Sequence, residues 1–214
     1  QGTIEFADGG KYEGGFKDDQ YHGRGTLKYA DGSIYVGEWK EGQYQGQGTL
    51  EWVSGGKYAG QWKGDYRDGR GTYEYFNGDK YVGQWKDDFE HGQGVYTWKN
   101  GDVYDGGWKT GFQTGHGTIK YNNGDSFIGE WADGSKIHGT FKWQSGTYYV
   151  GPYDDGYRTG EGILIYADGA KYTGGFFEGL YNGQGKIVYA DESTYEGEFY
   201  EDKYHGQGII NWPD

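Results

Sequence analysis

Aromatic residues alternate with glycine and polar residues along most of the chain. Tyr35, Gly37 and Trp39 occupy every second position, so they share one face of a predicted strand. A polar loop is expected over 40–45, and a second alternating run follows over 46–53. The pattern therefore predicts two antiparallel strands joined as a β-hairpin.

The hairpin pattern recurs every 23 residues, as at Tyr12, Tyr35 and Tyr58, which predicts a repeat array in place of a compact globule. Residues 1–214 are interpreted as one array with a leading half-repeat at 1–9. Units are expected to start near 12, 35, 58, 81, 104, 127, 149, 172 and 195.

The unit 127–148 is irregular. It is one residue short, and Ile137-His138-Gly139 replaces its Gly-x-Gly. Pro152 follows in the next strand, where it removes a backbone donor and favours an edge or a bulge. A local bend is expected near 131–153.

Asn-Gly and Asp-Gly dipeptides separate successive hairpins. Both residues tolerate positive φ, so each pair is expected to form the two central residues of a tight turn. Glycine accounts for 46 of the 214 residues, which disfavours helices throughout. The turns occur at 31–32, 77–78, 100–101, 123–124 and 168–169.

Glycines on the ring-bearing face are expected to have a packing role. A ring from one strand covers the bare backbone that a glycine leaves on its neighbour. Gly46-Gln47-Gly48 is interpreted in this way, because a phosphate-binding loop needs a following helix and the sequence has none.

Tyr-x-Gly-x-Trp, a short polar loop, Gly-x-Gly and an Asn/Asp-Gly turn together resemble the MORN repeat (membrane occupation and recognition nexus). The resemblance covers nearly the whole chain. It implies an all-β, elongated single-layer antiparallel twisted sheet, a hairpin meander with an aromatic-lined groove. It also implies a non-enzymatic scaffold that binds a protein partner, as a helix or peptide, and links cytoskeleton and membrane inside the cell, in the cytoplasm.

The inward rings form columns along the array. We expect them to be the core of a curled sheet, with exposed edges that form a groove for the partner. Candidate partner-binding residues are Tyr35, Trp39, Trp52, Tyr58, Trp62, Tyr81, Trp85, Trp98, Tyr104 and Trp108.

The outer face is mostly polar, but it becomes apolar after the irregular unit. A contiguous apolar patch on an outer face indicates an interaction surface, although strand propensity alone also explains such residues. The resemblance implies dimers through terminal repeats, so a homodimer through the C-terminal repeats is expected here. The patch consists of Tyr148, Val150, Ile163, Ile165 and Val188.

The net charge of −13 and the pI of about 4.7 disfavour binding to nucleic acids and broad adhesion to anionic membranes. Contact with phospholipid is therefore expected to be weak or indirect. The chain has no cysteine, which excludes a disulfide framework, and no methionine, so we expect it to be part of a longer protein.

No catalytic, metal or cofactor site is expected. The carboxylates recur from unit to unit, whereas a catalytic pair should be singular. His22, His91 and His205 occupy one repeated position and are far apart in the sequence. Two alternatives stay open: a carbohydrate-binding array, in which Tyr and Trp rows stack on sugars, and a phospholipid-binding module for membrane attachment.

Overall fold

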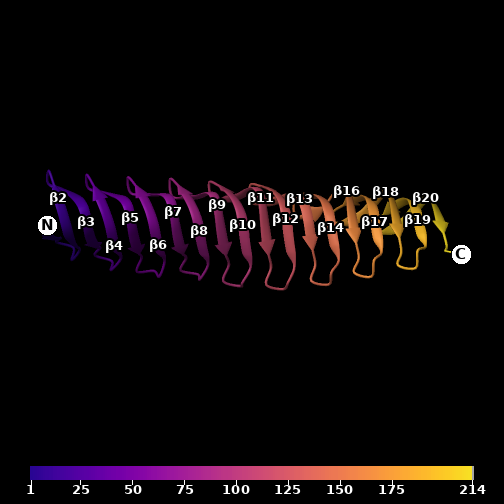
Figure 1. Cartoon of the computed structure of the whole chain (residues 1–214), viewed down its shortest axis with the longest axis horizontal. Coiled ribbons are helices and arrows are strands. Elements are labelled where there is room, and N and C mark those ends of the chain that lie inside the picture. The colour runs from indigo at the N-terminus through magenta and orange to yellow at the C-terminus, as the bar shows by residue number, and fades with distance from the viewer. Residues whose placement is uncertain (214) are drawn as a thin grey trace. The chain divides into compact units, whose positions relative to one another are not determined.

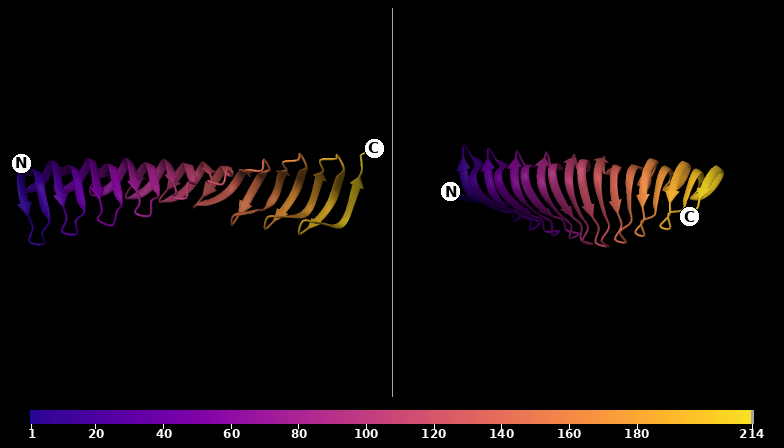
Figure 2. Two further views of the ribbon diagram at one scale, coloured as in Figure 1. Left: turned by 90° about the horizontal axis from the view of Figure 1, so that it is seen from below. Right: turned by 45° about the vertical axis from the view of Figure 1, so that its right-hand side comes forward.

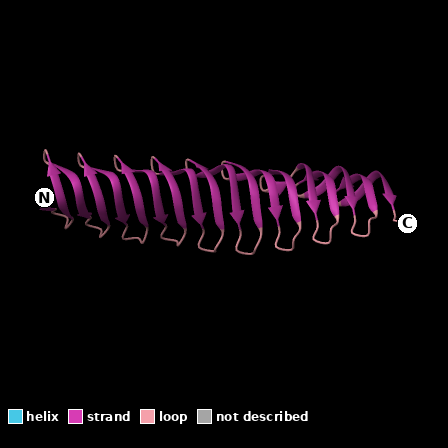
Figure 3. Ribbon diagram, viewed as in Figure 1, coloured by secondary structure: helices cyan, strands magenta, loops and turns pink. Residues whose placement is uncertain are grey.

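The structure is a computed structural model that describes residues 1–213. It contains twenty β-strands and, within these residues, no helix, so none that could cross a membrane (Figures 1 and 3). The predicted all-β class is confirmed. The chain divides into two compact units, Gln1–Phe112 and Gln113–Asp214, called unit 1 and unit 2 below.

In unit 1 each strand pairs antiparallel with the next, which confirms the predicted open meander. The strands are β1 (Gly2–Glu5), β2 (Lys11–Lys17), β3 (Gln20–Lys28), β4 (Ile34–Lys40), β5 (Gln43–Glu51), β6 (Lys57–Lys63), β7 (Tyr66–Glu74), β8 (Lys80–Lys86), β9 (Phe89–Thr97) and β10 (Val103–Lys109).

The strands that follow form the same kind of antiparallel sheet in unit 2. They are β11 (Phe112–Lys120), β12 (Ser126–Ala132), β13 (Ser135–Lys142), β14 (Tyr148–Asp154), β15 (Tyr157–Arg158), β16 (Gly160–Ile165), β17 (Lys171–Phe177), β18 (Leu180–Val188), β19 (Thr194–Tyr200) and β20 (Lys203–Asn211).

The two-residue turn lies at the opposite end of each hairpin from the one predicted. In the Asp31-Gly32 turn only Gly32 has positive φ, 95°, and its N–H donates to the Tyr29 carbonyl at 3.0 Å. This is a three-residue loop that ends on a left-handed glycine. At the other hairpin end Glu41 and Gly42 both have positive φ, 52° and 81°, as a type I′ turn requires.

The predicted loop 40–45 therefore shrinks to two residues, and β5 already starts at Gln43. Its extra residues sit in a bulge, since Gly37 pairs with Gly48 while Glu38 pairs with Gln45. The Glu38 carboxylate accepts the Gln47 N–H at 3.3 Å inside this bulge. In the next repeat Gln61 takes the place of Glu38. Its side-chain oxygen accepts the Arg70 N–H at 2.7 Å.

The core lies on the ring-bearing face, as predicted. Tyr81 has no exposed surface, and its ring covers the paired glycines Gly83 and Gly94. A β-carbon added to Gly83 would lie 2.6 Å from both the Tyr81 ring and the Gly94 Cα. The strands are strongly curved within each unit (Figure 2), and the rings of neighbouring strands pack on one another within the single layer.

The irregular region of unit 2 differs from the prediction in detail. Pro152 stays within β14, and the interruption falls on the partner strand, which breaks into β15 and β16 around Thr159. The Pro152 carbonyl accepts the Thr159 N–H at 3.1 Å. Proline lacks a backbone N–H but keeps its carbonyl acceptor. The missing hydrogen bond therefore interrupts the neighbouring strand and not β14 itself.

Candidate partner-binding site

The rings expected to line a groove are mostly interior. Trp62, Trp85 and Trp108 are only 3–5% exposed, and the tyrosines that precede them have no exposed surface. The prediction that the edges of these rings are exposed is therefore wrong. Of the ten candidates, Trp52 and Trp98 are half-buried and can reach a partner. Binding through these rings stays a prediction. The core residues are Tyr35, Trp39, Tyr58, Trp62, Tyr81, Trp85, Tyr104 and Trp108.

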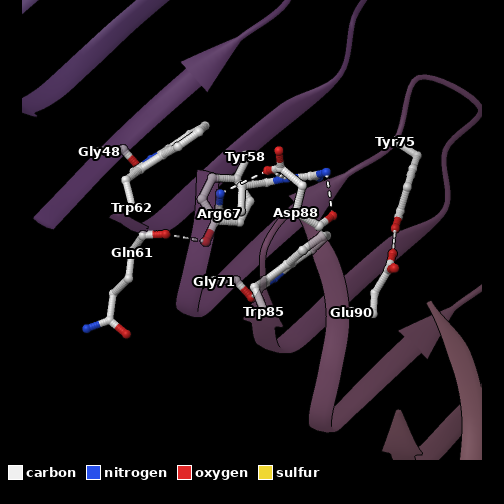
Figure 4. A network of polar contacts seen from close by, with 10 residues as sticks. All are labelled: Gly48, Tyr58, Gln61, Trp62, Arg67, Gly71, Tyr75, Trp85, Asp88 and Glu90. Atoms are coloured by element: carbon white, nitrogen blue, oxygen red, sulfur yellow. Dashed lines mark hydrogen bonds and ion pairs between the residues drawn. The ribbon is translucent and has the colours of Figure 1, made fainter. Parts of the chain in front are cut away.

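Ring packing explains this burial. Trp85 meets Tyr81 edge-on at a centroid distance of 5.1 Å and Tyr58 of the preceding repeat at 5.4 Å. The indole N–H of Trp62 donates to the Gly48 carbonyl at 3.1 Å (Figure 4). Each tryptophan is therefore covered by tyrosines of two repeats and fastened to the backbone.

The buried tyrosines carry no charge at neutral pH. Burial, and secondarily the charge of Asp105, raises the pKa of Tyr104 to about 12. Burial also raises the pKa of Tyr149 to about 12, while Arg158 opposes the rise. The Tyr104 hydroxyl donates to the Gly107 carbonyl at 3.1 Å. These hydroxyls thus satisfy the backbone and are not available for acid–base chemistry.

In several repeats the position two residues after the type I′ turn completes the core, and the sequence analysis missed it. Tyr44 stacks on Tyr35 at 3.6 Å, whereas Arg67 occupies the equivalent position and lies 4.3 Å over the Trp85 ring. Arg67 also donates to the Asp88 carboxylate at 2.9 Å (Figure 4). The available signal was the recurrence of Tyr, Arg or Lys at this position in all hairpins except those with Glu90 and Gln113.

Lys136 fills this position in the irregular repeat. Its ammonium lies 5.2–5.3 Å from the ring centroids of Tyr121, Phe127 and Phe141. Burial lowers its pKa, and the three rings provide a compensating cation–π contact. The lysine closes the core at a position where Arg158 serves the next repeat and stacked tyrosines such as Tyr44 serve others.

Unit 1 has a groove of about 1370 Å³ on the sheet face opposite the rings. One uncharged row runs along its floor, because the register places each member beside the next: Thr26 opposite Val36, and Val36 opposite Thr49. Glu13 and Asp105 continue the row at its two ends. The row comprises Thr26, Val36, Thr49, Ala59, Thr72, Val82 and Val95.

Polar side chains flank this row. Arg24 pairs across strands with Glu38, and Arg70 with Gln84, all within the groove lining. Val36 and Val82 are 52% and 46% exposed. An open, uncharged floor with a polar border is the composition expected of a surface that binds another macromolecule.

The groove that the structure shows in unit 1 lies on the face opposite the predicted aromatic lining. Alternation placed Val36 and Thr49 outside correctly, but it gave no information on curvature. The aromatic lining was expected from the resemblance and from exposed ring edges, and these edges are buried. The row of small and β-branched outer residues was the available signal.

The outer patch of unit 2 is only partly contiguous. Tyr148 pairs with Ile165, and Val150 with Ile163, so the structure brings these four half-buried side chains together. Val188 is half-buried but lies beyond Lys171, which pairs with both Ile165 and Val188. The patch is thus a four-residue cluster with a separate valine.

No metal centre is visible in the part of the chain that the structure describes. Within residues 1–213 no three His, Asp or Glu side chains gather around one point.

One solved structure shares the fold at low sequence identity, and a second is similar over less of the chain. The wild-type TCP10 domain of Danio rerio CPAP is 10% identical, with 92% of this chain and 93% of that chain covered and a TM-score of 0.51. The SAS-4 (dCPAP) TCP domain of Drosophila melanogaster, in complex with a proline-rich motif of Ana2 (dSTIL), is 15% identical, with 81% and 89% covered and a TM-score of 0.45. No curated relative matches the sequence.

A family model gives the stronger result. The MORN repeat model matches residues 12–34, 35–57, 58–80, 81–103, 104–126, 149–171, 172–194 and 195–214. It does not match 127–148, the unit that is irregular in sequence. The matched segments cover most of the chain, and the chain therefore belongs to the MORN repeat family.

Proposed function

We propose that the protein is a non-enzymatic scaffold that binds a segment of a protein partner in the groove of unit 1. The observation that carries the proposal is the uncharged row from Thr26 to Val95 on an open sheet face. The backbone of glycine pairs such as Gly37 and Gly48 also lines this groove.

The row runs across the strands, which limits what can bind. From β3 to β9 it crosses six strand spacings, about 29 Å at roughly 4.8 Å each. An α-helix of about 19 residues spans that length. An amphipathic helix with small apolar residues on one face fits, as does an extended peptide that contacts the row through its side chains.

The test compares two variants in a quantitative pull-down with cross-linking. Val36→Glu combined with Val82→Glu places two charges in the floor, and it should reduce partner recovery at least about tenfold. Val53→Glu is the matched control, because Val53 is 67% exposed and outside the groove lining. Unchanged recovery by a folded groove variant would contradict the proposal.

We also propose that the protein links the cytoskeleton to a membrane. Its own contact with phospholipid is then weak or indirect. The net charge of −13 opposes adsorption to anionic lipids. The partner, and not the sheet itself, would supply the attachment. The expected location is the cytoplasm.

A homodimer through unit 2 is proposed separately, on the cluster of Tyr148, Val150, Ile163 and Ile165. These half-buried apolar side chains occupy paired positions on β14 and β16. Light scattering at about 100 µM should show a dimer that Ile163→Glu with Ile165→Glu converts to a monomer. A wild-type monomer at this concentration would refute the dimer, and a dimer that survives the double substitution would exclude this cluster as its contact.

A further inference from the structure

Two tyrosines of unit 2 touch through their hydroxyl groups. Tyr189 directly follows β18 and Tyr204 lies on β20, with β19 paired to both strands between them. The two hydroxyls share a hydrogen bond. The Tyr204 ring also stacks on Tyr195 of β19 at a centroid distance of 3.7 Å. The two phenols are therefore held together across the intervening strand, although they are 15 residues apart in the sequence.

Exposure distinguishes this pair from other tyrosine pairs that make the same contact. Each of the other pairs has a member that is only 7% exposed, whereas Tyr189 and Tyr204 are 37% and 46% exposed. Both phenols of this pair can therefore meet a reagent in solution. The partly buried pairs are Tyr29 with Tyr44 and Tyr166 with Tyr181.

The composition directs oxidants to such rings. The chain has no cysteine and no methionine, whose sulfur atoms are the usual targets of oxidants in proteins. Exposed tyrosines are then among the side chains that lose an electron most readily. Burial, and secondarily the hydrogen bond with Tyr189, raises the pKa of Tyr204 to about 12. Tyr204 therefore keeps its proton at neutral pH, and the hydrogen bond between the two phenols persists.

We propose that Tyr189 and Tyr204 form a site of oxidative cross-linking, at which the two rings join as dityrosine. Each phenol loses one electron and its hydroxyl proton, and the two phenoxyl radicals couple through the ring carbons next to the C–O carbons. Contact between the hydroxyls brings these carbons close together. Their hydrogens then move to the oxygens, which restores both hydroxyls.

The co-reactant is hydrogen peroxide, used by a haem peroxidase. In the overall reaction one C–C bond forms between the rings, two C–H bonds break, and two electrons and two protons leave the protein. One molecule of hydrogen peroxide takes up both electrons and both protons and yields two molecules of water. The reaction is therefore balanced without any group that the protein would have to supply.

The cross-link fastens a strand that has few neighbours. All residues of β20 are exposed, and within residues 1–213 this strand pairs only with β19. A bond between the two rings ties β20 to the end of β18 and closes a loop over Tyr195. Closing a loop restricts the unfolded chain, so the cross-link stabilises the folded sheet.

Peptide mapping of the full chain after treatment with a haem peroxidase and hydrogen peroxide tests the proposal. Trypsin cuts after Lys186 and Lys203, so it places Tyr189 and Tyr204 in separate peptides. Monomers isolated on a denaturing gel should yield these peptides joined, with a mass lower than their sum by two hydrogens. Free tyrosine in a parallel reaction verifies the oxidant, so absence of the joined peptides would overturn the proposal.

Matched variants locate the cross-link. Tyr204→Phe keeps the ring but removes the hydroxyl, and it should lower the yield of joined peptides at least about tenfold. Tyr200→Phe is the control, because Tyr200 is 53% exposed and lies in the same tryptic peptide as Tyr189. It should change the yield less than about twofold. Equal melting temperatures before oxidation show that both variants are folded, and equal yields from the two would overturn the assignment.

A second comparison separates contact from exposure. Tyr66 and Tyr157 are 55% and 57% exposed, more than either member of the pair. Products that join Tyr66 or Tyr157 between chains, without the product that joins Tyr189 to Tyr204, would overturn the proposal in favour of exposure alone. The purified cross-linked chain should also melt at a higher temperature than Tyr204→Phe treated in the same way.

Discussion

The two units bury the same kind of core but present different outer faces. In unit 1 the ring that ends each Tyr-x-Gly-x-Trp strand is Trp39, Trp62, Trp85 or Trp108 after the first hairpin, whereas unit 2 uses Phe176 and Phe199 in its last hairpins. All of these rings are buried. The core therefore requires a ring at this position, and not a particular ring.

The outer row is where the units diverge. In unit 1 it is uncharged from Thr26 to Val95, while in unit 2 the equivalent row contains Lys186 and Glu196, which form an exposed 2.9 Å ion pair. The comparison teaches that rings and glycines maintain the architecture. The outer side chains, which the repeat pattern leaves free to vary, differ between the units.

The largest expected effect tests the core role of the tryptophans. Trp108→Ala should cost roughly 3–5 kcal/mol of unfolding free energy, because it leaves a cavity at a position that is 5% exposed. Trp108→Phe should cost much less, since Phe176 and Phe199 fill the equivalent position in unit 2. Denaturant unfolding measures both, and equal losses would show that unit 1 needs tryptophan itself.

A glycine pair gives the next largest effect. Gly83→Ala should destabilise the protein by about 1–3 kcal/mol, because the added methyl group overlaps the Tyr81 ring and the Gly94 backbone. Gly56→Ala is the control, since its new carbon would be at least 3.3 Å from other atoms and Ala170 holds the same position in unit 2. Similar stabilities of the two variants would contradict close ring-over-glycine packing.

Alkaline pH should reduce stability in both units. The pKa of Tyr104 is about 12 in the folded protein and about 10 when unfolded. A raised folded pKa contributes stability below pH 10 that is lost as the pH rises through 12. Tyr104→Phe, which copies Phe127 at the equivalent position, should lose less stability from pH 9 to 11.5 than the wild type. Denaturant unfolding at each pH measures the loss. Equal losses in the variant and the wild type would mean that Tyr104 ionises with its ordinary pKa.

The smallest expected effect concerns lipids. The isolated chain should co-sediment weakly or not at all with anionic vesicles at physiological salt, because its net charge is −13. Strong, salt-sensitive binding would instead implicate the recurrent exposed lysines such as Lys63 and Lys86.

Most of the fold could be predicted from the sequence because the same alternation of rings and glycines recurs in every repeat. Tyr81, Gly83 and Trp85 alternate, and this spacing alone identifies the strand, its buried face and the ring-over-glycine packing. The turn types were missed because Asp31-Gly32 satisfies two different hairpin loops equally well. Only the paired register, with its bulge at Gly37 and Glu38, distinguishes them.

The candidate site was predicted less well, for a physical reason. Periodicity specifies which residues share a face, but curvature decides which face encloses its side chains. Tyr58 and Trp62 are buried because they pack on each other and on rings of neighbouring repeats, while the open groove lies on the opposite face, with Val36 and Thr49. The bulges, such as the one at Gly37 and Glu38, become visible only in the paired register.

Thiol accessibility tests the central claim most directly, because the chain has no cysteine and each engineered thiol reports alone. Val36→Cys and Val82→Cys lie on the groove floor at positions that are 52% and 46% exposed, while Leu50→Cys lies on the ring face at a position that is 8% exposed. Iodoacetamide should modify the two groove thiols at least about tenfold faster than the Leu50→Cys thiol. A Leu50→Cys thiol that reacts as fast as the groove thiols in a folded protein would contradict the assignment of core and groove.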